Sequence, residues 1–219
     1  GFISAIFIGT LLSANTYMNE FIVHTNDLSP SGVTNIVKQL PSNIKALDMS
    51  NCVRLEERSK GDKKVEKKVA SSTEIPPERL AEMWYAITEL VWLEKLTLDR
   101  DHLSELPYVG KLLNLKSLSI SNNKLTLLPD DIGLIDGLKT LILHGNQLIE
   151  LNSAVGELEN LEKIDLRSNK LAYLTPTVSQ LRNLKYLDVS ENMIQSLDPS
   201  IGDLHFAEKC EFNSNPLVN

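Results

Sequence analysis

Residues 115–125 read Leu-Lys-Ser-Leu-Ser-Ile-Ser-Asn-Asn-Lys-Leu, and their spacing decides the fold. The same spacing of apolar residues and asparagine returns from Leu138, Leu161 and Leu184, each 23 residues after the previous copy. Chance can produce one such copy, but four copies in one register indicate an internal repeat. The sequence therefore predicts a repeat protein in which each unit buries its apolar side against its neighbours.

Two degenerate copies flank the four regular ones. One runs from Leu93 to Leu103 and is one residue short of the period, and the other runs from Ala207 to Leu217. In each copy the apolar residues alternate in the way that buries one face of a short strand. Strands of successive units are therefore expected to stack in parallel and to line the inner curve of the molecule.

The ninth position of the unit holds an asparagine. It leaves the strand at a tight turn, where its amide can bond backbone groups of its own and the neighbouring unit. We predict a purely structural role for this ladder, with Asp101 as a departure from it. Its predicted members are Asn26, Asn123, Asn146, Asn169, Asn192 and Asn215.

On these residues, the chain resembles the leucine-rich-repeat family over positions 93–219. The resemblance implies an α/β fold class, namely a curved leucine-rich-repeat solenoid with a parallel β-sheet on the concave side. It implies 3₁₀, irregular and some helical structure on the convex side. The units of 23 residues resemble the short class of these repeats.

The first third of the chain follows a longer repeat. Met18 begins a copy of the strand-and-ladder pattern, and apolar residues with helical spacing follow Pro30. Ser29 is the predicted N-cap of this helix and Pro30 its first residue. The next unit begins at Ile44, 26 residues after Met18. Such units are similar to ribonuclease-inhibitor-like repeats and to repeats of effectors secreted by intracellular bacterial pathogens.

The predicted organisation has five parts. These are an N-terminal apolar strand or cap (1–17), long repeat units (18–53), a charged insertion (54–76), a helix (77–92) and short repeat units (93–219). The apolar start is shorter than the roughly 20 residues that span a bilayer. A leftover targeting segment is the alternative there. The lysine-rich insertion is expected to be solvated, with a docking or regulatory segment as the alternative.

The segment 77–92 contains two tryptophans. The helical spacing predicts that both tryptophans, Trp84 and Trp92, pack in the core of the convex side. The residues with this spacing are Leu80, Met83, Trp84, Ile87 and Val91. The alternative is that they anchor an interface.

Composition narrows the function classes. The net charge of −7 argues against nucleic acid as a ligand, because that binding needs a broad basic surface. The two cysteines are too far apart for a disulfide framework, and no Asn-x-Ser/Thr sequon occurs. We therefore expect a cytoplasmic monomer that binds neither nucleic acid nor a membrane.

The sequence shows no catalytic, cofactor or metal site. The four histidines have no metal-ligand spacing with each other or with cysteine, and phosphate-binding and nucleophile motifs are missing. Cys210 occupies an apolar strand position and is predicted to lie in the core. The expectation is therefore a protein that is not an enzyme and carries no cofactor.

The solvent-facing strand positions supply the candidate binding site. Asp165, Asp188 and Glu211 share one position in consecutive units and should form an acidic column whose like charges repel. The solvent-facing residues Lys163, Arg167 and Lys209 are expected to relieve part of that repulsion. This column predicts a partner that carries basic groups; an ordinary solvated face is the alternative. The candidate partner-binding residues are Ile142, His144, Asp165, Arg167, Tyr186, Asp188 and Glu211.

The function that follows is a protein–protein interaction module, an adaptor, scaffold or recognition domain that binds a partner through its concave face. Two alternatives stay open at this point. One is a secreted bacterial effector domain that acts in host cytosol, and the other is the targeting domain of a larger ligase, phosphatase or kinase. A purely structural spacer is a further possibility.

Overall fold

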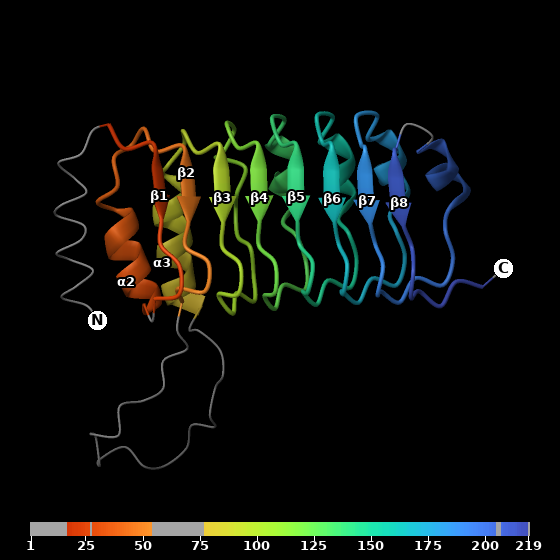
Figure 1. Cartoon of the computed structure of the whole chain (residues 1–219), viewed down its shortest axis with the longest axis horizontal. Coiled ribbons are helices and arrows are strands. Elements are labelled where there is room, and N and C mark those ends of the chain that lie inside the picture. The colour runs from red at the N-terminus through yellow and green to blue at the C-terminus, as the bar shows by residue number, and fades with distance from the viewer. Residues whose placement is uncertain (1–16, 27, 54–76, 205–206, 219) are drawn as a thin grey trace, which may run out of the picture.

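A computed structural model describes residues 17–26, 28–53, 77–204 and 207–218. They form one parallel sheet whose strands follow the order of the sequence (Figure 1). Neighbouring strands are in register, so that Leu118 lies opposite Leu141. The strands are β1 (Glu20–Ile22), β2 (Ala46–Asp48), β3 (Lys95–Thr97), β4 (Ser117–Ser119), β5 (Thr140–Ile142), β6 (Lys163–Asp165), β7 (Tyr186–Asp188) and β8 (Lys209–Glu211).

The core lies behind the sheet. Leu118, Ile120 and Leu125 of one unit are fully buried, as are Leu141, Leu143 and Leu148 of the next unit. These residues belong to one continuous apolar cluster that runs through the units. Each unit therefore depends on its neighbours for the burial of its apolar side, which confirms the predicted solenoid.

The return path of each unit runs on the convex side and depends on the length of the unit. The longer units hold the helices α2 (Pro30–Val37) and α3 (Pro77–Thr88), which pack against each other (Figure 1). Ser29 caps α2 by accepting a hydrogen bond from the Gly32 amide at 3.1 Å, as predicted. The units of 23 residues have room only for 3₁₀ turns: η1 (Asp130–Leu134), η2 (Ser153–Glu157), η3 (Pro176–Gln180) and η4 (Pro199–Asp203).

A left-handed turn residue stands three positions after the end of each strand, directly before the ladder position. In the β5 unit this residue is Gly145, with φ +67°. A Cβ at Gly145 would lie 2.6 Å from Asn122 Oδ1, so the turns of adjacent units are in close contact. In the other units the left-handed residue is Thr25, Asn51, Arg100, Asn122, Ser168, Glu191 or Ser214.

The asparagine ladder joins each unit to the one before it. Asn169 Oδ1 accepts a hydrogen bond from the Leu148 amide, and its Nδ2 donates to the carbonyls of Leu143 and Leu166. Asn123, Asn146, Asn192 and Asn215 make equivalent bonds. Asn26 is exposed, and its Nδ2 donates to the His24 carbonyl of its own unit. Residues 1–16, which precede that unit, lie outside the described residues.

Two ladder positions hold other residues. Asp101 is fully buried; its Oδ1 accepts hydrogen bonds from the amides of Cys52 and Val53, and its Oδ2 has no partner among the described residues. Cys52 Sγ donates to the Val23 carbonyl at 2.8 Å. Burial raises the pKa of the Asp101 carboxyl to about 7 and that of the Cys52 thiol to about 11. Both residues thus keep part of the ladder, but they do so with groups that resist ionisation.

A second series of amide bonds was not predicted from the sequence. The Nδ2 groups of Asn114, Asn160 and Asn183 each donate to a carbonyl of the preceding unit at 2.8–2.9 Å. These asparagines are exposed and stand directly before the first leucine of their units. They link the units along the edge where each strand begins.

The structure corrects two predictions about the core. Trp84 is buried as predicted, but Trp92 is 58% exposed because α3 ends at Thr88, before it reaches Trp92. Cys210 is also exposed, because no strand covers the outer side of β8 among the described residues. The predicted cap and charged insertion fall almost entirely outside the residues that the structure describes. None of the described helices has the length and apolar character to cross a membrane.

Candidate protein-binding face

The concave face presents three side-chain columns that run across the strands. The first column, at the first strand residue, is Glu20, Ala46, Lys95, Ser117, Thr140, Lys163, Tyr186 and Lys209. The second column, at the third strand residue, is Ile22, Asp48, Thr97, Ser119, Ile142, Asp165, Asp188 and Glu211. The third column, two residues further on, is His24, Ser50, Asp99, Ser121, His144, Arg167, Ser190 and Asn213.

The seven candidate partner-binding residues all lie on this face, in the four adjacent units of β5 to β8. Asp165, Asp188 and Glu211 are register partners in the second column, next to Ile142. His144 and Arg167 belong to the third column and Tyr186 to the first. The structure therefore brings them together on one surface.

The acidic column is not the row of free, repelling charges that its spacing predicted. Asp188 is only 6% exposed, and its carboxylate accepts hydrogen bonds from the amide and hydroxyl of Ser190 and from the Tyr186 hydroxyl. Burial alone would raise the pKa of Asp188. The bonds from Ser190 and Tyr186 and the nearby Arg167 outweigh burial, and the pKa lies below its usual range.

The neighbouring carboxylates are engaged in the same way. Asp165 Oδ1 accepts from the Arg167 amide at 3.2 Å, and Oδ2 lies 3.5 Å from His144 Nδ1. Glu211 Oε1 is 2.8 Å from Lys209 Nζ, and Oε2 accepts from Asn213 Nδ2 at 2.9 Å. In each case the residue two places after the acid donates to its carboxylate: Arg167 through its backbone amide, Ser190 through its amide and hydroxyl, and Asn213 through its side-chain amide. Spacing alone does not reveal this local geometry.

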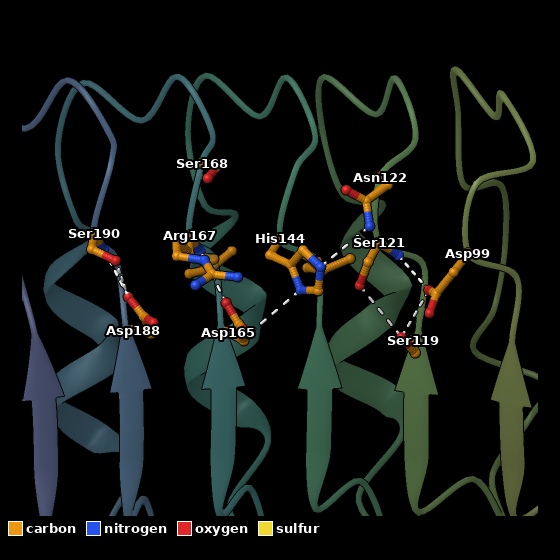
Figure 2. Close-up of polar contacts among 12 residues, drawn as sticks. Asp99, Ser119, Ser121, Asn122, His144, Asp165, Arg167, Ser168, Asp188 and Ser190 are labelled. Atoms are coloured by element: carbon orange, nitrogen blue, oxygen red, sulfur yellow. Dashed lines mark hydrogen bonds and ion pairs between the residues drawn. The ribbon is translucent and has the colours of Figure 1, made fainter.

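Polar contacts also run diagonally between units (Figure 2). His144 lies between Asn122 and Asp165: its Nε2 is 3.2 Å from Asn122 Nδ2, and its Nδ1 faces the Asp165 carboxylate. Ser119 Oγ donates to Asp99 at 2.8 Å across the same diagonal. A third-column side chain thus contacts the second-column side chain of the following unit, which holds the surface in a fixed arrangement.

The cationic side chains of this face are exposed to solvent. Lys163 Nζ lies 4.9 Å from the centre of the Tyr186 ring, and Lys209 Nζ lies 5.6 Å from it. The three residues are register partners in β6, β7 and β8. The Tyr186 ring is half-buried, whereas both lysines are exposed. The sequence placed these residues on the face, but it did not show that the two ammonium groups lie over one ring.

The opposite half of the face contains a shallow polar depression of about 390 Å³. Its lining residues are His24, Thr25, Ser50, Asn51, Asp99, Arg100, Asn122 and His144. Hydroxyl, amide and imidazole groups dominate it, a chemistry suited to hydrogen bonding. Among the described residues, no group of three or more His, Cys, Asp or Glu side chains is placed to hold a metal ion.

Ion pairs border the face where the strands begin. Glu94 bridges Lys45 and Lys116 at 2.8 and 2.6 Å, and Glu162 bridges Lys139 and Lys185. Hydrogen bonds from Lys116 and Lys45 lower the pKa of Glu94 to about 2. These lysines are therefore already paired, whereas Lys163 makes no ion pair within the described part of the chain.

Comparison with known protein families finds two matches in the chain. A model described as Leucine rich repeat matches residues 159–204, and a second model with the same description matches residues 114–134. None of the curated protein sequences matches the chain. The matched residues carry strands β4, β6 and β7 and the turns that follow them.

Solved structures show the same architecture. A leucine-rich-repeat protein of Leptospira interrogans superposes with a TM-score of 0.67 at 27% identity, over 94% of this chain and 45% of that one. The leucine-rich-repeat ectodomain of a plant membrane receptor kinase from Arabidopsis thaliana, in complex with Casparian strip integrity factor 2, also gives 0.67. That likeness has 21% identity, covers 94% of this chain and 25% of the receptor chain, and concerns the fold alone. The chain spans less than half the length of either protein.

Proposed function

Because this chain is a leucine-rich-repeat protein, we propose that it binds a partner protein through its concave face, as an adaptor or recognition module. One observation carries the proposal: neighbouring strands hold the outward side chains of β5 to β8 in register over a continuous apolar core. Domains of this family generally mediate protein–protein interactions. The plant receptor neighbour was solved in complex with Casparian strip integrity factor 2. That complex supports the same use of the fold here.

Preorganisation favours binding by this face. The diagonal contacts of His144 and Asp99 hold surface side chains in place before a partner arrives. A partner therefore loses less of its binding free energy to the ordering of these side chains. Tyr186 and Arg167 are of the residue types that dominate binding energy at protein interfaces.

Affinity capture with matched variants tests this proposal. Ile142→Arg places a bulky charge on the concave face, and Leu134→Arg places the same charge on the convex side, where Leu134 is 58% exposed. We expect the unmodified chain and Leu134→Arg to capture the same partner, and Ile142→Arg to lose it. Equal thermal melting of both variants is the control for folding.

The opposite pattern would contradict the proposal. If Leu134→Arg loses the captured protein while Ile142→Arg retains it, the partner binds the convex side. If neither variant changes capture, the partner does not use the concave face around β5.

The proposed compartment is the cytoplasm. Both cysteines are free thiols, and Cys210 is exposed, which suits a reducing environment. Fractionation of cells that express a tagged chain tests this proposal: recovery with the cytosolic fraction supports it, and recovery with the secreted fraction contradicts it.

A further inference from the structure

The surface of β6 to β8 offers a partner hydrogen-bond donors rather than acceptors. Five of the six carboxylate oxygens of Asp165, Asp188 and Glu211 are hydrogen-bonded or ion-paired within this chain, and the sixth, Asp165 Oδ2, lies 3.5 Å from His144 Nδ1. Their side chains are also recessed, with exposures of 15% for Asp165 and 27% for Glu211, while Asp188 as a residue is 6% exposed. A basic partner segment would have to break internal contacts before it could pair with them.

The lysines of the same surface keep N–H donors that no carboxylate of the described residues occupies. Lys163 makes no ion pair among the described residues, and its ammonium lies over the Tyr186 ring. Lys209 forms an ion pair with Glu211, but its side chain remains 58% exposed. An aromatic ring attracts a cation without accepting its three N–H bonds as an oxygen would. The ammonium groups over the Tyr186 ring therefore keep N–H donors that face solvent.

We infer that the partner segment that docks here is acidic, and that its carboxylates bind Lys163 and Lys209 on either side of Tyr186. This inference rests on the proposed concave-face binding and names the chemistry of the partner. Arg167, exposed in the third column beside Asp188, adds a third cation to the surface. The name "Tyr186 clamp" denotes Tyr186 with Lys163 and Lys209.

The spacing of the Tyr186 clamp favours an extended segment. Lys163 and Lys209 lie two strands apart, which is roughly 9.5 Å in a β-sheet. Residues i and i+3 of a polyproline II helix lie about 9.3 Å apart on one side. A segment with acids at every third position can therefore reach both lysines. The residues of the segment that lie between two acids can then contact the Tyr186 ring.

The net charge of −7 repels an acidic segment at long range. At about 0.15 M salt this repulsion is screened beyond roughly 8 Å, whereas contacts inside the clamp persist. Binding is therefore best measured at that ionic strength. Selectivity must come from the short-range arrangement of the clamp and not from the overall field.

Two stiff peptides of opposite charge, four repeats each of Glu-Pro-Pro and Lys-Pro-Pro with blocked ends, serve as probes. Each is titrated into the ¹⁵N-labelled full chain while backbone amide shifts are followed by NMR. We expect the acidic probe to shift the amides of β6 to β8 in a saturable way and the basic probe to leave them unchanged. Shifts of β6 to β8 by the basic probe alone, or none with the acidic probe, would overturn the inference.

A matched pair of variants locates the contact. Lys163→Glu with Lys209→Glu reverses two charges in the clamp, and Lys116→Glu with Lys139→Glu makes the same change in total charge at the border. We expect the clamp variant to weaken the acidic probe about tenfold or more and the border variant to weaken it less than about threefold. Equal weakening in both would show that only total charge matters and would overturn the inference.

Lys163→Gln with Lys209→Gln repeats the test without new charge, in case the reversal variant fails to fold. It should also weaken the acidic probe more than the border variant does, and unchanged affinity would contradict the clamp. If Ile142→Arg abolishes partner capture while the acidic probe fails to bind, concave-face binding stands and the acidic partner alone is wrong.

Discussion

At the scale of single residues, the ladder shows how one side chain can serve two units. An asparagine supplies an acceptor and two donors from a neutral group, which suits a buried position between backbone strands. Asp101 supplies the acceptor only, and its second oxygen has no partner among the described residues. Ionisation of the Asp101 carboxyl therefore lowers the stability of the folded chain, because burial opposes the charge.

Asp101→Asn should make the chain more stable at neutral and alkaline pH. Burial raises the folded-state pKa of Asp101 from 3.8 to about 7, so the folded chain holds this proton more tightly than the unfolded chain. The protonated acid adds stability below pH 4, and this stability is lost as the pH rises through 7. Asparagine is neutral throughout, so the gain should be on the order of 4 kcal/mol at pH 8 and small at pH 4.

Urea denaturation of both proteins at pH 4 and pH 8 measures this difference. A gain that is equal at the two pH values would contradict ionisation of Asp101 as its cause.

Asn169→Ala should cost roughly 1–3 kcal/mol of unfolding free energy, because it leaves the buried Leu148 amide without its partner. The carbonyls of Leu143 and Leu166 lose one of their bonds but keep those from Asn146 and Asn192. Asn183→Ala is the matched control, since Asn183 makes one exposed bond to a carbonyl. It should cost less than about 1 kcal/mol. If chemical denaturation gives the two variants equal losses, burial of the side-chain amide does not decide its contribution to the free energy of unfolding.

At the scale of elements, unit length selects the convex structure. Twenty-six residues allow α2, whereas units of 23 residues allow only 3₁₀ turns. The strands, the ladder and the cap at Ser29 were predictable, because each follows from residue spacing and local hydrogen bonding. The end of α3 at Thr88 was not predictable, because Val91 continues the apolar spacing although it is 41% exposed. That error placed Trp92 in the core.

The turn after each strand also yields a prediction. Gly145→Ala should destabilise the chain by roughly 1–2 kcal/mol, because alanine disfavours a φ of +67° and its Cβ would lie 2.6 Å from Asn122 Oδ1. Gly202→Ala is the control, since no atom lies within 4 Å of a Cβ there. Thermal melting should show a clear loss for the first variant only; equal losses would contradict the role of the turn.

At the scale of the whole molecule, the parallel sheet places residues that are one repeat apart side by side on one surface. The sequence predicted which side chains share the concave face, because the register follows from the repeat. It could not predict which charges remain available, because that depends on side chains folding back within each unit. The burial of Asp188 and the exposure of Lys163 are the observations on which we propose an acidic partner, whereas the basic partner expected from the acidic column stays a prediction.

Site-specific photocross-linking tests the central claim, binding through the concave face, most directly. A photoreactive phenylalanine replaces Tyr186 on the concave face or, in a matched variant, the 62% exposed Tyr85 of α3 on the convex side. Each variant is irradiated with the captured partner, and the cross-linked product is quantified. The account predicts a strong product from position 186 and little from position 85. A product from position 85 alone would contradict it.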